Sequence, residues 1–340
     1  MVDFLKRVDK HRKNKTLNAF KYLGIAFLFA FAIIAPAFIS YTIFTTKQSV
    51  DNMYKPSKAI TTENKIETLQ SDGSHTRIGI LLIGLDNDSE RNLGSTRSDS
   101  LIYLAYDGEN KEITMVSLPR DIYTDIYDGD GNILNQGKIN SAYTHNEVDS
   151  TIETVTNYLD LPIDYYATVN FISFKQIIDA VGGIEVNVPY DINSELAKDN
   201  SGDLLIPKGD QHLNGEQALI FSRIRKADDD IQRGNRQQEV IKATIKSALS
   251  INSITKYQEI LKAVDGNIET NFTFDNLTSL AGNMLDGFNI KTNTFDWEGG
   301  FVGAESVVYI NQESYNTIRS SLLKSLGLET DYTQKTNSVY

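Results

Sequence analysis

The sequence predicts a layered α/β domain, in which helices cover both faces of a central mixed sheet, preceded by one N-terminal transmembrane helix. Three observations support this fold class. Strand patterns and helix patterns alternate along the middle of the chain, which is typical of α/β domains. Three of the strand patterns are continuous apolar runs, as expected for strands covered on both faces. One uncharged apolar run near the N-terminus is long enough to cross a membrane.

The uncharged run extends from Tyr22 to Thr46. At about 1.5 Å per residue, a helix of this length measures about 37 Å, and a hydrocarbon core is about 30 Å thick. Residues 1–47 carry eight basic and two acidic residues, and seven of the eight bases precede the run. The positive-inside rule therefore predicts a single-pass cell-membrane protein with a cytoplasmic N-terminus and an extracellular C-terminal part.

A cleaved signal peptide is the alternative, since the Ala-Pro-Ala sequence at residues 35–37 resembles a cleavage site. The apolar run is longer than a usual signal core of about 7–15 residues and continues past that site, which favours an uncleaved signal anchor. We therefore expect a basic cytoplasmic segment over 1–21 and the anchor over 22–46. Residues 47–76 are polar and contain turn-forming residues, so they are expected to form an extracellular stalk.

Three apolar runs follow the stalk and are predicted to form the centre of the sheet, over residues 78–85, 101–106 and 113–118. The elements after them are expected in this order: a helix over 146–159, a strand over 165–170, a helix over 174–181 that ends at two glycines, a strand over 184–188, a helix or helix-to-strand element over 213–224, and a helix over 233–249.

The remainder of the chain has weaker patterns. Residues 253–325 hold three weak helical patterns and one apolar strand pattern, Ser306–Ile310. No linker rich in Pro or Gly separates this segment from the residues before it. We therefore expect a catalytic domain over 77–250, a C-terminal part over 251–326 that packs on it, and a polar tail over 327–340.

Charge and composition exclude several classes of protein. The net charge is -12, but residues 1–47 contribute +6, so the rest of the chain, with 25 bases and 43 acids, carries -18. Such an acidic part offers no extended basic face, and no nucleic-acid partner is expected. The chain has no cysteine, which excludes a disulfide scaffold, a thiolate zinc site and a cysteine nucleophile. Motifs of P-loop, serine-hydrolase and HExxH zinc enzymes are also absent.

Six of the nine arginines beyond residue 47 lie in three short motifs. In the first motif, Asp86 directly follows an apolar strand, and Arg97 and Asp99 directly precede the next one. In the second, Arg120 follows a strand and a proline. Ligands of layered α/β sheets gather outside the carboxyl ends of strands, so these residues are placed as site residues would be.

The third motif runs from Arg223 to Gln237 and also contains Arg236. Residues two apart in an extended stretch point the same way, so Arg223 and Arg225 would share a face. Residues four apart share a face of a helix, so Arg233 and Gln237 would do so as well. Two such groups on separate elements can hold one anion from two sides.

These residue types indicate a phosphate site with a divalent metal. The planar guanidinium group of arginine suits phosphate oxygens, and Mg²⁺ prefers a few carboxylates, here Asp86 and Asp99, together with phosphate oxygens. The alternative for the arginines is neutralisation in surface ion pairs by nearby acids such as Asp121 and residues 228–230. The alternative for the strand-end carboxylates is an ordinary role in turns.

Between about Ile78 and Leu249 the chain contains, in this order, GLD, RSDSLIYLAYD, ITMVSLPRDIYTDI, GKINSAY, LPIDYYATVNFISFKQIIDAVGGIEVNVP, LIPKGDQHLNGEQALIFSRIR and RGNRQQEV. This series closely resembles the LytR-CpsA-Psr family of cell-wall glycopolymer ligases. A basic N-terminus with a single span is also usual in that family.

The resemblance implies a phosphotransferase that moves a glycopolymer, such as teichoic acid or capsular polysaccharide, from an undecaprenyl-pyrophosphate lipid to a sugar hydroxyl of peptidoglycan. It implies Mg²⁺, with Mn²⁺ as an alternative, on Asp86 and Asp99. Arg97 and Arg120 would take part in the reaction, and Asp230 would position or deprotonate the acceptor hydroxyl. The implied pyrophosphate ligands are Arg97, Arg120, Lys138, Arg223, Arg225, Arg233, Arg236 and Gln237.

The expected partners are the lipid-linked donor, peptidoglycan and membrane lipid. An apolar slot for the polyprenyl tail could be lined by a set of residues that is equally compatible with an ordinary core: Phe171, Phe174, Ile177, Ile178 and Phe221. The same site would also serve a lipid-pyrophosphate hydrolase, with water as acceptor, or a non-catalytic receptor for polyprenyl phosphates. Asp86 and Asp99 favour an enzyme, because binding alone would tolerate the loss of metal carboxylates. The sequence predicts neither the polymer, the accepting hydroxyl nor the oligomeric state.

Overall fold

The structure is a computed structural model that describes residues 41, 43–60, 77–86, 97–197, 203–224, 230–250, 260–262, 265–284 and 287–328. The chain divides into two compact units, residues 1–48 and 49–340. In the first unit, residues 41 and 43–48 are helical. Across the ranges given above, no helix is both apolar and long enough to cross a membrane. Most of the predicted span over 22–46 lies outside those ranges.

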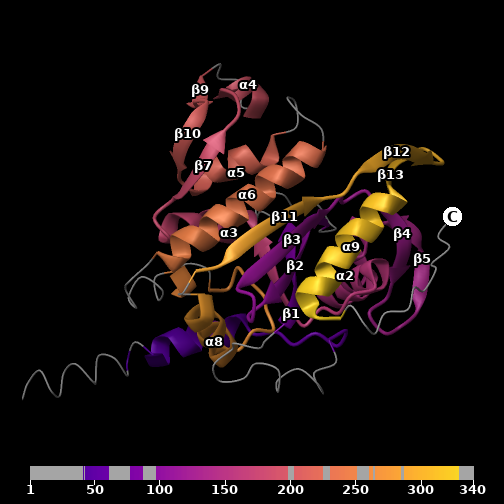
Figure 1. Ribbon diagram of the computed structural model, residues 1–340, viewed down its shortest axis with the longest axis horizontal. Helices are drawn as coiled ribbons and strands as arrows, with labels where there is room; N and C mark the ends of the chain where they lie inside the picture. The colour runs from indigo at the N-terminus through magenta and orange to yellow at the C-terminus, as the bar shows by residue number, and fades with distance from the viewer. Residues whose placement is uncertain are drawn as a thin grey trace, which may run out of the picture. The chain divides into compact units, whose positions relative to one another are not determined.

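The second unit is built on a five-stranded mixed sheet with the strand order β11-β3-β2-β1-β6 (Figure 1). Its strands are β1 (Arg77–Leu85), β2 (Ser98–Asp107), β3 (Glu112–Leu118), β6 (Tyr165–Asn170) and β11 (Asn289–Thr294). β1 is parallel to β6 and β3 is parallel to β11, whereas β2 lies between β1 and β3 and is antiparallel to both. The carboxyl ends of four strands and the start of β2 therefore share one edge, here called the carboxyl edge.

Helices cover both faces of this sheet. One face packs on α2 (Tyr143–Leu159) and α9 (Gln312–Leu326), as the buried cluster of Tyr103, Val155 and Leu322 shows. The other face packs on α6 (Asp230–Leu249) and α8 (Phe274–Met284), where Met115 and Leu280 belong to one cluster. Because side chains alternate along a strand, odd-numbered residues of β2 face α2 and α9, and even-numbered residues face α6 and α8. The predicted mixed α/β fold with a central sheet is confirmed.

Shorter elements surround the sheet. A further buried cluster joins α3, α5, β7 and β10 with the inner side of α6. The elements outside the sheet and its four covering helices are β4 (Tyr123–Tyr127), β5 (Ile133–Lys138), η3 (Ile139–Ser141), α3 (Phe171–Ala180), β7 (Ile184–Val188), β8 (Ile192–Asn193), α4 (Ser194–Ala197), β9 (Leu204–Ile206), β10 (Gly209–Leu213), α5 (Gly215–Arg223), β12 (Trp297–Val302) and β13 (Glu305–Ile310).

The strands and helices predicted between residues 78 and 249 are present, with shifts of a few residues at their ends. One local prediction is wrong: Arg223 is the last residue of α5 and not part of an extended stretch. Asn214 caps this helix, since its side chain accepts a hydrogen bond from Gln217 N, and helical geometry continues to the end of the FSR sequence. The C-terminal part also does more than pack on the domain, because β11 is a strand of the central sheet.

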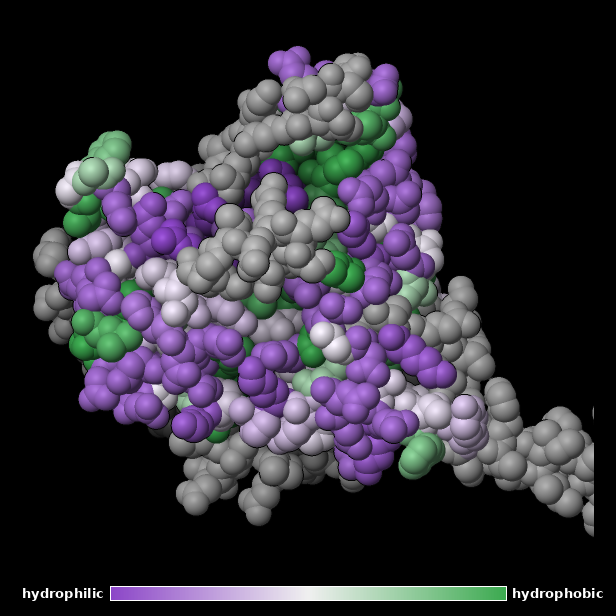
Figure 2. Space-filling view, turned by 180° about the vertical axis from the view of Figure 1, so that it is seen from behind, coloured by the Kyte–Doolittle hydropathy of each residue, from purple (hydrophilic) through white to green (hydrophobic). Residues whose placement is uncertain are grey.

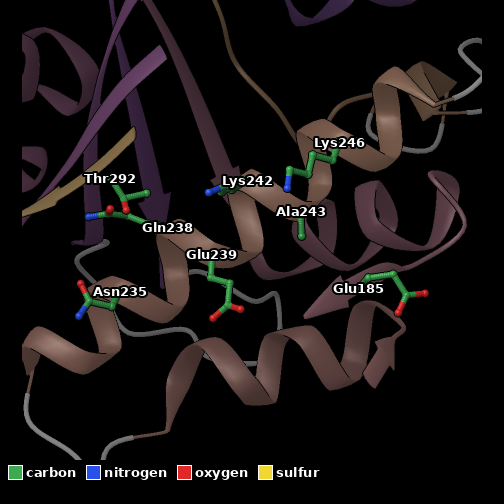
Figure 3. Close-up of a pocket in the computed structure, with 8 residues that line it drawn as sticks. All are labelled: Glu185, Asn235, Gln238, Glu239, Lys242, Ala243, Lys246 and Thr292. Carbon is green, nitrogen blue, oxygen red and sulfur yellow. The ribbon is translucent and has the colours of Figure 1, made fainter. Parts of the chain in front are cut away.

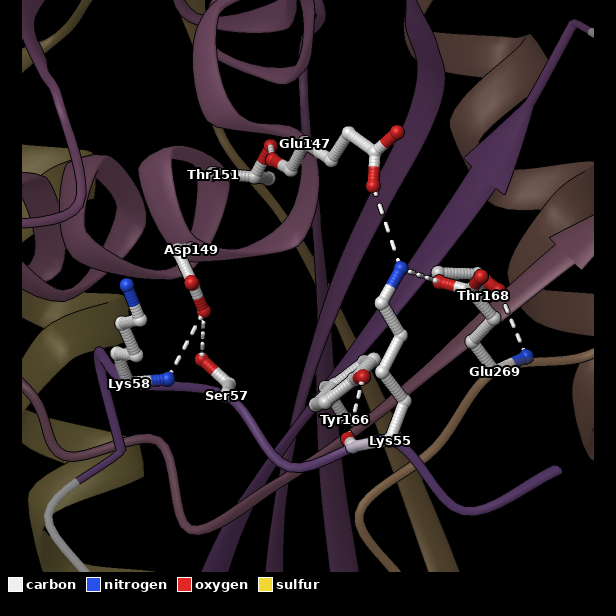
Figure 4. Close-up of polar contacts among 9 residues, drawn as sticks. All are labelled: Lys55, Ser57, Lys58, Glu147, Asp149, Thr151, Tyr166, Thr168 and Glu269. Carbon is white, nitrogen blue, oxygen red and sulfur yellow. Dashed lines mark hydrogen bonds and ion pairs between the residues drawn. The ribbon is translucent and has the colours of Figure 1, made fainter.

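Residues 53–60, here called the strap, belong to the segment predicted as a stalk, and they contact the rest of the second unit (Figure 4). Lys55 Nζ lies 3.2 Å from a carboxylate oxygen of Glu147 and 3.0 Å from one of Glu269. Asp149 accepts hydrogen bonds from Ser57 Oγ and from the Lys58 backbone N–H. Burial disfavours the charged form of Lys55, but its bonds to the two glutamates outweigh burial and raise its pKa.

Candidate active site

The carboxyl edge brings together residues from three strands. Asp86 follows the last residue of β1, and the pairing of Leu85 with Ser98 places it beside the start of β2. Arg97 directly precedes β2, and its side chain is exposed. Arg120 follows β3, whose last residue pairs with Leu101 in β2. The sheet topology therefore gathers the first two predicted arginine motifs at one edge.

A row of alternating charges lies on the side of this edge that carries α2 and α9. Arg120 Nη1 is 2.7 Å from Asp99 Oδ1, and Arg120 Nε is 3.5 Å from Asp121 Oδ2. Lys138 Nζ is 3.2 Å from the other oxygen of Asp121. All four side chains are between 21% and 29% exposed, so they are partly shielded from water but still accessible to a ligand. Asp121 thus holds two of the predicted phosphate-binding cations in place.

The backbone around Arg120 is fixed by a turn and a short hairpin. Ile122 N donates to Pro119 O at 3.2 Å, which closes the turn that contains Arg120 and Asp121. The carbonyl of Arg120 accepts a hydrogen bond from Asn140 N, directly after the hairpin β4–β5 that ends at Lys138. Both cations of the charged row are therefore positioned by the same local structure.

The first turns of α6 approach the same edge from the opposite face. Gly234 lies against β3, and a Cβ atom there would be 3.2 Å from Ser117 Oγ. Asn235 Oδ1 accepts a hydrogen bond of 2.5 Å from Thr294 Oγ1 at the end of β11. Gln237 Oε1 accepts one of 2.9 Å from Ser100 Oγ, and Arg233, four residues earlier, is buried. Predicted ligands thus flank the edge from two sides, and the partial positive charge of a helix N-terminus adds to theirs.

Sequence reasoning missed the role of Ser100. It adjoins Asp99 in the RSDS motif, and strand alternation directs it to the other face of the sheet, where it reaches α6. The RSDS motif could have predicted this contact. In a strand, a serine that directly follows an aspartate points to the opposite face of the sheet.

Two further arginines differ in their surroundings. The guanidinium carbon of Arg223 lies 4.2 Å from the centre of the Phe171 ring, and Phe171 directly follows β6 at the carboxyl edge. Arg236 is buried, and its guanidinium donates to the carbonyls of Phe221 and Ile224 at the end of α5, at 3.0 and 2.6 Å. The structure thus gives Arg236 backbone partners in place of an open position at the edge.

Two predicted site features lie outside the described residues. These are Arg225 as a whole and the side chain of Asp230, whose backbone begins α6. Among the predicted tail-lining residues, Ile178 and Phe221 are fully buried in a core cluster, whereas Phe174 and Ile177 are only partly buried. Ile178 and Phe221 are therefore ordinary core residues.

The donor set at the edge fits Mg²⁺. Asp86 and Asp99 come from the adjacent ends of β1 and β2 and offer hard oxygen ligands, and Mg²⁺ commonly completes its shell with water and phosphate oxygens. In the part of the chain that the structure describes, no three His, Asp or Glu side chains gather as a metal cage.

Figure 2 shows a hollow near the top of the molecule, where a hydrophobic wall adjoins strongly hydrophilic surface.

A polar cavity of about 430 Å³ lies on the flank of α6 (Figure 3). It is lined by Glu185, Asn235, Gln238, Glu239, Lys242, Ala243, Lys246 and Thr292. None of these residues belongs to the predicted site, and acids balance the two lysines, so the candidate active site is the carboxyl edge.

Comparison with known proteins gives a family match over residues 40–324, to the LytR_cpsA_psr family. The polyisoprenyl-teichoic acid–peptidoglycan teichoic acid transferase TagU of Bacillus licheniformis is 35% identical over 325 residues, covering 94% of this chain and 99% of that protein. TagV of Bacillus subtilis, which bears the same transferase name, is 33% identical over 322 residues, covering 92% of this chain and 80% of that protein.

The chain is also similar to solved structures of named relatives. The crystal structure of B. subtilis TagV superposes with a TM-score of 0.63 at 32% identity, covering 76% of this chain and 98% of that one. A structure described as TagT bound to LIIa-WTA superposes with the same TM-score at 28% identity, covering 74% of this chain and 91% of that one.

Proposed function

The chain belongs to the LytR-CpsA-Psr family, and from that premise we propose that it transfers a teichoic acid or related glycopolymer from a polyprenyl-pyrophosphate lipid to a peptidoglycan hydroxyl, with Mg²⁺ as cofactor. That it is a transferase of cell-wall glycopolymer attachment follows from its relatives. The observation that supports the finer proposal most is the row Asp99–Arg120–Asp121–Lys138 at the carboxyl edge, opposite Arg233 and Gln237 on α6.

In the proposed reaction, the acceptor hydroxyl attacks the phosphorus that carries the glycan. The bond from that phosphorus to the bridging oxygen breaks, polyprenyl phosphate leaves, and a phosphodiester forms between glycan and acceptor. The hydroxyl proton passes to a base, for which Asp230 is the predicted group. Negative charge builds on the bridging and equatorial oxygens, and groups fixed beforehand stabilise it most effectively.

The described side chains suit that task. Arg120 is held by carboxylates on both sides, so its guanidinium needs little reorganisation when a phosphate binds. Lys138 is held in the same way by Asp121. Asp86 and Asp99 would hold Mg²⁺, which when bound supplies further positive charge to the pyrophosphate oxygens.

The two ends of the donor would leave the edge on opposite sides of the sheet. Between the sheet and α6, several apolar side chains are only partly buried, among them Ile80, Leu82 and Ile241. We place the polyprenyl tail there, because it would cover apolar surface that the protein leaves partly open. The glycan would then extend toward the side of α2 and α9.

We also propose that the predicted span over 22–46 keeps the enzyme in the cell membrane, with residues 49–340 outside the cell. An anionic donor is repelled over long distances by a part of the chain that carries a charge near -18. Delivery within the plane of the membrane avoids that barrier, because the lipid donor and the anchored enzyme then meet without crossing the solution.

The test uses the full chain in detergent micelles with a polyprenyl-pyrophosphate glycan, peptidoglycan oligomers and Mg²⁺. Glycan covalently attached to peptidoglycan is the expected product, and its loss on chelation with return on adding Mg²⁺ supports the metal. Phosphorylated glycan in solution without attached product would show a hydrolase. Binding of donor without any turnover would show a receptor.

Variants connect that activity to the carboxyl edge. Asp99→Asn and Arg120→Ala should each lower kcat at least about a hundredfold, since fixed charges at a developing oxyanion are worth about 3 kcal/mol. Lys291→Ala is the matched control, because Lys291 also forms a partly exposed ion pair, with Glu112, but lies within β11. Wild-type rates in both site variants would contradict the assignment.

A further inference from the structure

The hairpin β12–β13 is attached beside the Arg120 turn and continues past the end of β11 (Figure 1). Val308 N donates to Asp121 O at 2.9 Å, and Val308 forms a parallel bridge with Ile122. Val308 is buried in the cluster on the side of α2 and α9. The base of the hairpin is therefore fixed to the residue that follows Arg120.

Aromatic contacts hold the hairpin in place. The ring of Tyr309 lies over Gly300, where a Cβ atom would be 2.6 Å from the nearest ring carbon. On its other side Tyr309 meets Tyr123 of β4 edge to face, with 6.4 Å between ring centres. The glycine thus allows a close contact that locks both strands of the hairpin against β4.

Phe301 is 77% exposed near the tip of this hairpin. It pairs with Ser306, so it points to the same face of the hairpin as Val308, which is the face toward α2, α9 and the charged row. Ser306 lies two positions before Val308 in β13, a step of about 7 Å along the strand. A single exposed apolar side chain is common on proteins, but this one lies two residue pairs along the hairpin from Val308, which is bridged to Ile122 beside the Arg120 turn.

The charge of the hairpin favours a neutral partner. Residues 297–310 contain Glu298 and Glu305 and no basic residue. An anionic membrane surface would be repelled by these carboxylates. A sugar ring is uncharged and has a face of C–H groups, which packs on an aromatic ring.

We propose that Phe301 is a stacking platform for a sugar ring next to the reacting phosphate. This inference rests on the proposed function, which supplies a sugar on either side of that phosphate. The ring belongs either to the glycan of the donor or to the peptidoglycan acceptor, and the two sources share the same chemistry. The platform determines sugar binding and takes no part in the phosphoryl chemistry.

The test compares Phe301→Ala, Phe301→Tyr and Phe301→Trp in the full chain, in detergent micelles with Mg²⁺, by varying donor and acceptor separately. Phe301→Ala should raise one KM about tenfold with kcat changed less than about twofold, since one stacking contact is worth about 1.4 kcal/mol. The aromatic replacements should restore KM. Leu134→Ala, which removes another exposed apolar side chain, is the matched control.

The two arms identify the source of the sugar. A raised donor KM places the donor sugar on Phe301, and a raised acceptor KM places the peptidoglycan sugar there. Unchanged KM values for both substrates in Phe301→Ala, beside an active wild type, overturn the inference alone. Weaker co-sedimentation of the variant with donor-free phosphatidylglycerol vesicles would show a membrane contact and overturn it too. A wild type without transfer would contradict the proposed function instead.

Discussion

Arg120 and Arg236 show how differently two arginines of the same predicted site can be used. The partners of Arg120 are carboxylates at an accessible edge, which can share the guanidinium with an incoming phosphate. Arg236 donates to two carbonyls at the end of α5 and to the hydroxyl of Tyr190, and its side chain is buried. One residue suits ligand binding and the other suits a structural link between α5 and α6.

The replacement Arg236→Ala should therefore act mainly by lowering the stability of the fold. We expect the free energy of unfolding in urea to fall by about 2–3 kcal/mol, because two buried carbonyls lose a charged donor. Arg120→Ala, in contrast, should change it by less than about 1 kcal/mol, because its partners remain partly hydrated. An Arg236→Ala protein as stable as the wild type but inactive would instead indicate a phosphate ligand.

The atoms packed around Gly79 in β1 leave no room for a side chain at this position. A Cβ atom there would lie 2.2 Å from Pro162 O and 2.3 Å from Tyr103 Oη, the two atoms of a hydrogen bond. Gly79→Ala should lower the free energy of unfolding by about 2–4 kcal/mol, because a strand or a buried tyrosine must move. Gly282→Ala in α8 is the matched control, since nothing lies within 4 Å of its Cβ position. Equal unfolding midpoints for the two variants would contradict this explanation.

At the scale of elements, the strap is fixed both by the buried side chains of Met53 and Ile60 and by polar contacts between them. Asp149→Ala removes the acceptor for both Ser57 Oγ and Lys58 N. We expect amide hydrogen exchange to accelerate at least about tenfold over 53–60, with the core of β1 unchanged, because the opening is local. Glu147→Gln should have a smaller effect, since Lys55 keeps its contact with Glu269. Uniform acceleration across the domain would show that the strap is part of the global fold.

Elements that face the core on both sides could be predicted from sequence, and polar elements could not. β1, β2 and β3 are apolar runs because both layers of helices cover them. β11 has the sequence NIKTNT, in which Ile290 alone is fully buried, because it is an edge strand. The strap likewise lacks an apolar pattern, and its carboxylate partners lie about 90 or more residues away in the chain.

At the scale of the whole molecule, the sequence showed which charged residues lie next to strand ends but not how they are arranged. Strand ends could be located, yet only the order β3-β2-β1 brings Arg120 to Asp99 and puts Asp86 next to the start of β2. The alternation within β2 then divides the site between two faces, with Arg120 on one side and Gln237 on the other. The number of nearby charged residues in the sequence could not distinguish Arg236 from the other predicted arginines, because its partners are two backbone carbonyls and a tyrosine hydroxyl.

Buried phenols make the folded chain sensitive to alkaline pH. Burial is the main cause that raises the pKa of Tyr165 and Tyr315 to about 12, and it also raises those of Tyr143, Tyr158 and Tyr166. An unfolded tyrosine titrates near pH 10. Each of these groups therefore contributes stability that is fully present below about pH 10 and is lost as the pH rises toward its folded pKa.

We accordingly expect Tm to be nearly constant between about pH 7 and pH 9 and to fall steeply above about pH 10, with the absorbance of phenolate appearing together with unfolding. Tyr165→Phe should weaken this dependence, because Phe cannot ionise, and the stack of ring 165 on Phe272, with centres 4.2 Å apart, needs no hydroxyl. Tyr54→Phe is the control, since Tyr54 is exposed. Full phenolate absorbance reached near pH 10 while the protein is still folded would contradict the burial of these hydroxyls.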